Sequence, residues 1–371
     1  MKRKIAVIAT EYIKEFLQSM LADRDFDYCI FTYKTFSDIQ HIHKNVTEEF
    51  DGILTSGSFP AHMIHLYYKE EKRPICFFNT DEAALYRLFL QLLNENRNLD
   101  FTRVYADIVE IFGVGLKDFV EGRSPMPDIR ELSEDEFDMD RMLGIEQEEY
   151  RKHVKLWEEG KIDLSVTRFS SIVPALQEAG VKVYFPFPSK RYVGEMCDKL
   201  LNEIERRKLE EQIPGVIIVK LSENGSGGEM FQGLDYDYMR LENLVIEFIG
   251  ASMIDCSVHR RHYGLEIVST KKHVSGWTGD FREDRLSPFL REKKLSARFS
   301  IGCGLGNSLS QARLNALDAC HEAELKQSLA YLINEREQII GPMGDCGQLL
   351  MNVDNSEVLD VQSRLSPLTV K

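Results

Sequence analysis

Two short polar turns carry the side chains best suited to hold a ligand. The first lies in "DGILTSGSFPAHMI" (residues 51–64), where Ser56, Gly57 and Ser58 separate an apolar run from a helical pattern. Backbone N–H groups at such a turn, together with the partial positive charge of a helix N-terminus, attract carboxylate or phosphate, and serine hydroxyls add donors. Taken alone, a structural turn that needs Gly57 for its backbone freedom is the simpler interpretation.

A second stretch strengthens the case for a ligand because it repeats the plan. Residues 162–189, like residues 50–80, run through an acidic residue, an apolar strand, a polar turn, a helix and another strand. The second turn holds Arg168, the one fixed positive charge near either turn, and a guanidinium suits an anionic ligand; the alternative is a surface salt bridge. The ligand-binding residues predicted from the two turns and the neighbouring strand ends are Thr10, Ser56, Gly57, Ser58, Thr80, Thr167, Arg168, Ser170 and Ser189.

Alternating strand and helix patterns predict the elements that position these turns. Residues 1–100 and 101–205 are expected to form two Rossmann-like α/β lobes with parallel sheets, and the Pro-containing acidic residues 122–140 a loop. The ends of the strands then face a cleft, which is where open parallel sheets bind ligands. A long helix over residues 189–212 would lead out of the lobes.

Residues 3–205 resemble the N-terminal sensory domain of the propionate-catabolism regulator family. The match rests on "DGILTSGSFPAHMI" in the first lobe and "IDLSVTRFSSIVPALQEAGVKVYF" in the second, with Ser58 where the family has a second glycine. The resemblance implies a small effector bound between the lobes, and no chemistry.

Residues 214–335 raise the question of an enzyme. Hairpin and helix patterns predict an α+β domain, and "RRHYGLEIVST" with "ARFSIGCGLGNSLSQARLNALDACHEAEL" resembles the ferredoxin-like GGDEF fold of diguanylate cyclases. The helix in the second stretch is expected to be capped by Ser308 or Ser310. The family's Gly-Gly-Asp-Glu-Phe turn falls on Tyr263, Gly264, Leu265, Glu266 and Ile267.

The carboxylates of a cyclase are largely missing. Phosphoryl transfer between nucleotides needs acidic residues that hold divalent metals. Lys220 or Leu221 stands where the family has its metal-binding Asp, and Leu265 replaces the Asp of the turn. Glu223 or Glu229 is a possible substitute, so a divergent nucleotidyl cyclase or GTP-processing enzyme stays the alternative to a sensor without catalysis. We predict no cofactor and no metal, and interpret His41, His43, His62 and His65 as ordinary surface or partly buried residues.

Three glycines precede the last strong helix. Gly302, Gly304 and Gly306 do not have the spacing of a dinucleotide fingerprint, so we do not expect a nucleotide site there.

Charge and composition limit the remaining partners. The 371 residues carry a net charge of −14, which disfavours direct binding to nucleic acid, and no segment approaches the roughly 20 apolar residues of a membrane span. The tail, residues 336–371, ends on "SRLSPLTVK", which is similar to the opening of a helix-turn-helix, so we expect DNA contact only through a domain beyond residue 371. Seven scattered cysteines without a CxxC pair indicate reduced thiols and a cytoplasmic protein.

The sequence thus predicts the sensing part of a bacterial transcription regulator, expected to be a homodimer, with a degenerate GGDEF-like domain that relays the signal. A scaffold that binds only protein is a third possibility.

Overall fold

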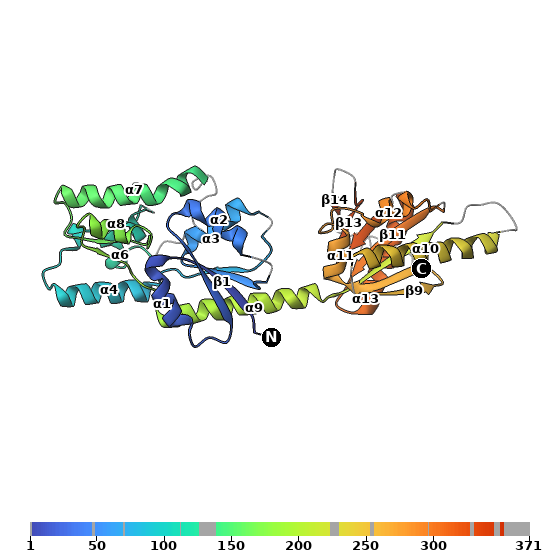
Figure 1. The fold of residues 1–371 in the computed structure, drawn as a ribbon, viewed down its shortest axis with the longest axis horizontal. Helices are drawn as coiled ribbons and strands as arrows, with labels where there is room; N and C mark the ends of the chain where they lie inside the picture. Colours follow the sequence, from blue (N-terminus) through green and yellow to red (C-terminus); the bar gives the residue numbers. More distant parts are fainter. Residues whose placement is uncertain are drawn as a thin grey trace, which may run out of the picture. The chain divides into compact units, whose positions relative to one another are not determined.

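The computed structural model describes residues 2–46, 49–69, 71–111, 113–125, 139–222, 230–252, 256–295, 297–326, 330–344 and 349–351. The chain divides into two compact units, Met1–Arg206 and Arg207–Lys371, and the boundary falls inside helix α9 (Lys190–Glu211) (Figure 1). The expected opening of a helix-turn-helix, most of the loop at residues 122–140, and Glu223, Glu229 and Cys346 lie outside the described residues.

The first lobe is a four-stranded parallel sheet in the order β2-β1-β3-β4. Its strands are β1 (Lys4–Thr10), β2 (Asp27–Tyr33), β3 (Gly52–Thr55) and β4 (Ile75–Phe77), with helices α1 (Glu11–Leu21), η1 (Phe36–Asp38), α2 (Ile39–Asn45) and α3 (Ser58–Tyr67). Side chains of β1 alternate between two buried clusters, one containing Ile5 and Val7 and the other Ala6 and Ile8. Both faces are covered, which is why the strand is continuously apolar.

The second lobe is a smaller parallel sheet in the order β5-β6-β7. Its strands are β5 (Val104–Ala106), β6 (Leu164–Val166) and β7 (Val183–Tyr184), accompanied by η2 (Phe101–Arg103), α5 (Asp107–Glu110), α6 (Leu116–Val120), α7 (Met139–Glu158) and α8 (Val173–Glu178). The two parallel sheets confirm the predicted α/β class with Rossmann-like lobes.

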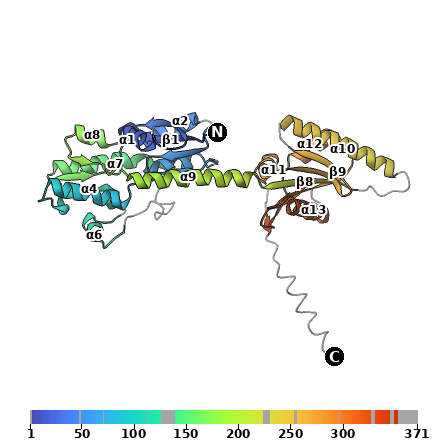
Figure 2. The same cartoon turned by 90° about the horizontal axis from the view of Figure 1, so that it is seen from below.

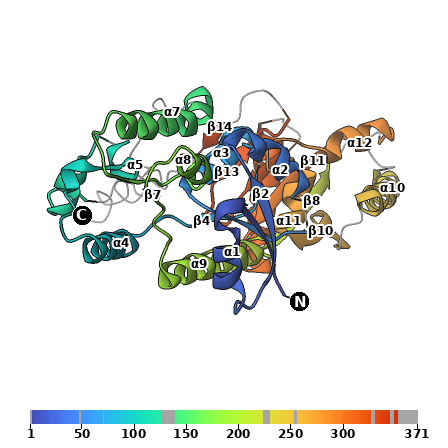
Figure 3. The ribbon, with the colours of Figure 1, turned by 60° about the vertical axis from the view of Figure 1, so that its left-hand side comes forward.

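The lobes exchange helices, so they differ from the contiguous ranges 1–100 and 101–205. Helix α4 (Glu82–Glu95) packs Leu85 and Phe89 against the sheet of the second lobe, beside α6 (Figure 2). Helix α9 returns to the first lobe, where Cys197 and Leu200 join the core beneath β1 and α1 (Figure 3). The chain therefore crosses between the lobes twice, at residues 78–81 and 185–189.

The second unit is built on a seven-stranded sheet in the order β14-β13-β12-β11-β8-β10-β9. Its elements are β8 (Pro214–Leu221), α10 (Met230–Ser252), β9 (Ser257–Arg261), β10 (Gly264–Thr270), α11 (Lys271–Trp277), α12 (Leu286–Glu292), β11 (Phe299–Leu305), α13 (Leu309–Leu325), β12 (Ala330–Ile333), β13 (Ile339–Gly341) and β14 (Leu349–Met351). The antiparallel order β11-β8-β10-β9 with interposed helices is the ferredoxin-like, split βαβ arrangement. The sheet continues through β13 and β14 into residues that the sequence assigned to the tail.

The glycines of β11 let α13 lie directly on the strand. A Cβ at Gly302 would lie 2.1 Å from the carbonyl oxygen of Ala316, and one at Gly304 would lie 2.1 Å from that of Ala312. These glycines therefore serve close helix-to-strand packing. Ser308 caps α13 by accepting a hydrogen bond from the N–H of Gln311 (3.2 Å), which confirms the predicted cap.

Among the described residues, no helix combines the length and the apolar character needed to cross a bilayer. Among the described cysteines, Cys76, Cys197, Cys303 and Cys320 are buried free thiols.

Candidate functional site

A cavity of about 200 Å³ lies between the two lobes of the first unit. Both predicted turns and both crossing segments contribute to its wall. Its lining comprises residues 56–60, 78–82, 168–171, 185 and 187–188, together with Ile13, Phe16, Leu17, Tyr33, Phe36, Ile108, Glu146 and Tyr192. The two turns, more than 100 residues apart in sequence, therefore meet at one site.

Six of the nine predicted ligand-binding residues line this cavity: Ser56, Gly57, Ser58, Thr80, Arg168 and Ser170. The other three do not line the cavity; their side chains form hydrogen bonds to residues in or next to its wall. Thr10 donates to the hydroxyl of Ser170 (2.8 Å), Thr167 donates to Asp107 (2.5 Å), and Ser189 donates to Asp81 (3.0 Å). Their hydrogen bonds place these three side chains behind the lining residues, and a ligand-binding role for them stays a prediction.

The first turn differs from its prediction in two ways. Gly57 has φ 178° and ψ 171°, an extended backbone that any residue adopts, so the glycine is not required for backbone freedom. The N–H groups of Ser56 and Ser58 already donate to the Ile8 carbonyl (2.9 Å) and to Asn79 Oδ1 (3.1 Å). The serine hydroxyls are therefore the better candidates for ligand contacts.

The second turn presents Arg168 as a half-buried part of the cavity wall. Its backbone N–H donates to Asp107 Oδ1 (2.7 Å), which fixes the turn after β6. Its guanidinium lies 4.7 Å from the ring centre of Phe59, and Nη2 reaches the Ser58 hydroxyl of the other lobe (3.5 Å). Among the described residues that line the cavity, Arg168 is the only lysine, arginine or histidine.

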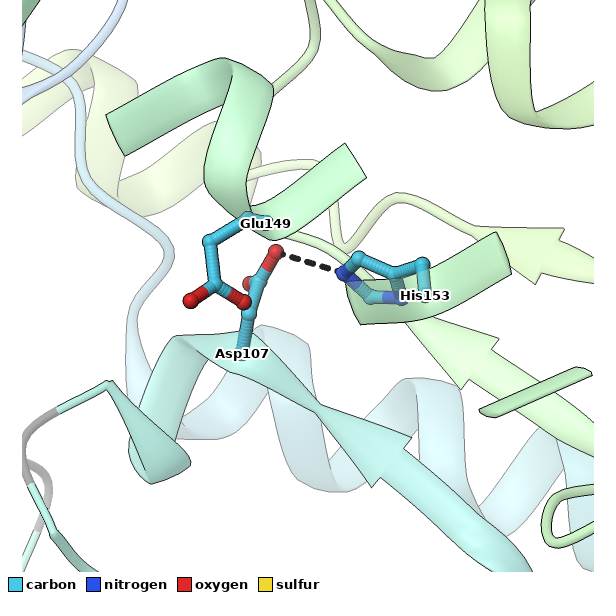
Figure 4. A group of neighbouring side chains, drawn as sticks. All are labelled: Asp107, Glu149 and His153. Atoms are coloured by element: carbon cyan, nitrogen blue, oxygen red, sulfur yellow. Dashed lines mark hydrogen bonds and ion pairs between the residues drawn. The ribbon is translucent and has the colours of Figure 1, made fainter. Parts of the chain in front are cut away.

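Behind Arg168 lies a buried polar network that was not predicted from the sequence. Asp107 follows β5, and Glu149 and His153 occupy the same face of α7 at a spacing of four residues (Figure 4). His153 Nε2 lies 3.0 Å from Asp107 Oδ2, its Nδ1 contacts the hydroxyl of Ser165, and Glu149 accepts a hydrogen bond from Tyr105 (2.6 Å).

These three side chains have the right chemistry for a divalent metal, because one ligand atom from each lies within 4.8 Å of the others. Each already has a protein partner, so the network is complete without an ion. Burial raises the pKa of the Glu149 carboxyl. The clearest consequence of the network is that Asp107 holds Thr167 and Arg168 in place.

Glu146, one turn earlier on α7, lines the cavity itself. Its side chain is 6% exposed, accepts a hydrogen bond from the Phe36 N–H (3.0 Å) and contacts the hydroxyl of Ser171. Burial raises the pKa of this carboxyl to about 7. Sequence analysis missed Glu146; the only available sign was its place beside Ile145 on the apolar side of an amphipathic helix.

Aromatic side chains supply the apolar part of the wall. The rings of Phe59 and Phe169, from different lobes, meet edge to face at 5.2 Å, and Phe36 stacks near Phe59 at 6.1 Å. Phe185 and Phe187 also line the cavity, and both rings contact Tyr12. Such a wall favours a ligand with an apolar body and a few polar groups.

The two crossing segments are bonded to each other beside the cavity. Thr80 donates to the Pro186 carbonyl (2.7 Å), while the Asp81 carboxylate accepts from the N–H and the hydroxyl of Ser189 (both 3.0 Å). Paired crossings of this kind form a hinge about which two lobes can close.

In the second unit, the structure places Tyr263 in the turn between β9 and β10 and puts Gly264, Leu265, Glu266 and Ile267 in strand β10. Leu265 is buried in the core. Glu266, also buried, accepts from the Arg313 guanidinium (2.6 and 3.1 Å) and from the Tyr263 hydroxyl. Burial opposes ionisation of Glu266, but these hydrogen bonds outweigh it and lower its pKa. The surviving carboxylate is therefore engaged by protein groups.

No known family model matches the chain, and no curated protein matches it. Two solved structures show a weak likeness. An NtrC family transcriptional regulator from Clostridium acetobutylicum is 15% identical, with 56% of this chain and 99% of that chain covered, at a TM-score of 0.36. The transcription regulator CcpA of Lactococcus lactis is 12% identical, with 56% and 92% covered, at a TM-score of 0.31. Likenesses at these TM-scores carry no information about function.

Proposed function

We propose that this chain is the sensing part of a cytoplasmic bacterial transcription regulator, which binds a small effector with an anionic group between its first two lobes and catalyses no reaction. The observation that carries the proposal is the cavity at which both polar turns meet, with Arg168 in its wall. A guanidinium beside serine hydroxyls recognises a carboxylate or phosphate well.

Binding would act through closure of the lobes. Thr10 and Ser170 bond across the cleft, as do Ser58 and Arg168, and the crossing segments supply the hinge. An effector shifts such an equilibrium only through its higher affinity for the closed form. An effector that bridges Ser58 and Arg168 has this property because it touches both lobes.

The second unit would relay the change or hold a homodimer as a degenerate GGDEF-like domain. Its ferredoxin-like topology suits that assignment, and the engagement of Glu266 by Arg313 argues against a metal-dependent cyclase.

A metabolite screen by thermal shift, run beside a GTP turnover assay with Mg²⁺, tests the proposal. We expect at least one anionic metabolite to raise the melting temperature, no turnover, and loss of the shift in Arg168→Met and Ser56→Ala. Formation of a cyclic dinucleotide from GTP would establish the enzyme instead. A cleft that binds nothing would favour the protein-binding scaffold.

A further inference from the structure

An acidic and a basic side chain both line the cavity. Glu146 reaches it from α7 and Arg168 from the turn after β6. Among the described residues, the hydrogen bonds to the Glu146 carboxyl come from neutral donors, the Phe36 N–H and the Ser171 hydroxyl. A carboxylate has about four acceptor positions, so these bonds leave capacity for a ligand donor.

The charges around the cavity do not suit a ligand that is only negative. The described lining residues include one guanidinium, Arg168, and three carboxylates, Asp81, Glu82 and Glu146. Asp81 is engaged by Ser189, and Glu82 is exposed at the start of α4, which leaves Glu146 as the buried carboxylate of the wall. A ligand that carries both a positive and a negative group complements the charges of Glu146 and Arg168.

We propose that the effector is a small zwitterion of the amino-acid type, with its carboxylate at Arg168, its ammonium group at Glu146 and an apolar side chain against Phe36, Phe59 and Phe169. This inference rests on the proposed sensing function and specifies the ligand class for the same cleft.

The size and the walls of the cavity agree with such a ligand. Its volume of about 200 Å³ lies below the range of roughly 300–1,000 Å³ that is usual for drug-sized ligands. The Ser58 hydroxyl lies 3.5 Å from Arg168 Nη2, where a carboxylate needs donors, and the aromatic rings of the wall suit an apolar group.

An ammonium group would also stabilise the ionised form of Glu146. Burial raises the pKa of this carboxyl to about 7, so ionisation is disfavoured while the cavity holds no cation. A bound ammonium would stabilise the ionised form and lower that pKa. Binding would then release protons near neutral pH.

Calorimetric titration of the full chain can test the ligand class with matched compounds. The probes are the twenty standard L-amino acids, the carboxylic acids obtained by removing their amino groups, and the amines obtained by removing their carboxylates; one such set is L-phenylalanine, 3-phenylpropionate and 2-phenylethylamine. We expect at least one amino acid to bind about tenfold or more tightly than either of its two analogues.

Substitution of Glu146 identifies the group responsible. Glu146→Gln should weaken binding of the amino acid about tenfold and leave the deaminated acid unaffected, because only the ammonium contact changes. Glu148→Gln, an exposed position on the same helix, is the control and should bind like the parent. Melting temperatures of both variants show that the fold is retained.

The possible failures are distinguishable. A deaminated acid that binds as tightly as its amino acid, or an amino acid whose affinity Glu146→Gln leaves unchanged, overturns the zwitterion and leaves the sensor standing. If thermal shift finds a metabolite that binds while no amino acid does, the zwitterion is again excluded and the sensing function stands. If neither experiment finds a ligand, the sensing function itself is wrong.

Discussion

Each unit of the protein contains a buried glutamate, but folding lowers the pKa of the glutamate in the second unit and raises that of the glutamate in the first. In the second unit, Glu266 accepts two hydrogen bonds from Arg313, lies 3.4 Å from Arg261, and has a lowered pKa. In the first unit, Glu146 accepts from an N–H and a hydroxyl, faces a cavity, and has a raised pKa.

This difference distinguishes a carboxylate that stabilises the fold from one that is available to a ligand. A buried carboxylate compensated by the protein stabilises the fold and offers little to a ligand. A buried carboxylate that the protein leaves difficult to ionise is destabilising by itself, and such groups cluster at functional sites. The raised pKa of Glu146 therefore supports the ligand binding proposed for the first unit, and the ion pairs of Glu266 stabilise the hairpin of the second.

The same substitution made in both units should produce the largest contrast. Arg313→Met leaves the buried Glu266 carboxylate with Arg261 and the Tyr263 hydroxyl as its neighbours, and should cost about 3–4 kcal/mol of unfolding free energy. Arg168→Met should cost about 1 kcal/mol or less, since it removes a cation–π contact and a long hydrogen bond.

The two tryptophans allow each unit to be measured separately. Trp157 packs against a core cluster of the first unit and Trp277 lies in the core of the second, so Trp277→Phe and Trp157→Phe backgrounds report one unit each during urea unfolding. Glu266→Met combined with Arg313→Met should recover much of the loss, because the buried charge is removed and Arg261 is partly exposed to solvent. Equal losses for the two single arginine substitutions would remove the distinction between the units.

Stability should depend on pH in opposite directions in the two units. The pKa of Glu146 is raised from 4.5 to about 7 on folding, so the folded state binds the proton more tightly than the unfolded state does. The first unit should therefore lose about 3 kcal/mol from this group as the pH rises from below 4.5 to above 7. Glu266, with its lowered pKa, should stabilise the second unit above pH 4.5 and lose that contribution as the pH falls further.

Difference measurements isolate these contributions from other titrating groups. Unfolding free energies of Glu146→Gln and Glu266→Gln, each subtracted from the parent from well below pH 4 up to pH 8 in the matching single-tryptophan background, give the two slopes. A first-unit difference that is flat between pH 4.5 and 7 would contradict the raised pKa of Glu146.

Asp107 should affect the position of the turn that carries Arg168 more than the charge of the cleft. Asp107→Asn replaces a carboxylate that accepts from Arg168, Thr167 and the ring of His153, and should cost about 2 kcal/mol. The Arg168 amide should then exchange its hydrogen faster. Asp163→Asn is the control, since Asp163 forms an exposed ion pair with Arg103 and should cost well under about 1 kcal/mol. Unchanged exchange at Arg168 would show that another group fixes the turn.

The sequence predicted the elements that local patterns determine. Both polar turns follow apolar strands of parallel sheets, and such strand ends share one edge, so Ser58 and Arg168 could be expected near one cleft. The cap at Ser308 and the α/β class were also predictable, because a cap and an alternating strand-helix order are local properties. The ligand-binding role of the turns stays a prediction.

Long-range packing determined what the sequence could not predict. Glu146 and His153 look like ordinary polar positions of an amphipathic helix. Their burial depends on long-range contacts of α7: Glu146 bonds to η1, 110 residues away, and His153 contacts β6, 12 residues away. Thr10, Thr167 and Ser189 stand at strand ends or beside a crossing, but a shift of one position directs a side chain away from the cavity. The exchange of α4 and α9 between the lobes leaves no local pattern at all.

The smallest predicted effect concerns the hinge. Thr80→Val removes the hydrogen bond to the Pro186 carbonyl, and should cost the first unit about 1 kcal/mol while leaving the second unit unchanged. Because the bond joins the two crossing segments, hydrogen exchange should increase in residues 78–81 and also in 185–189. Thr102→Val removes a bond to Asp100, only two residues away, and should increase exchange in neither segment. Faster exchange confined to residues 78–81 would mean that the crossings move independently, and the first unit would then lack the paired hinge that lets its cleft respond to a ligand.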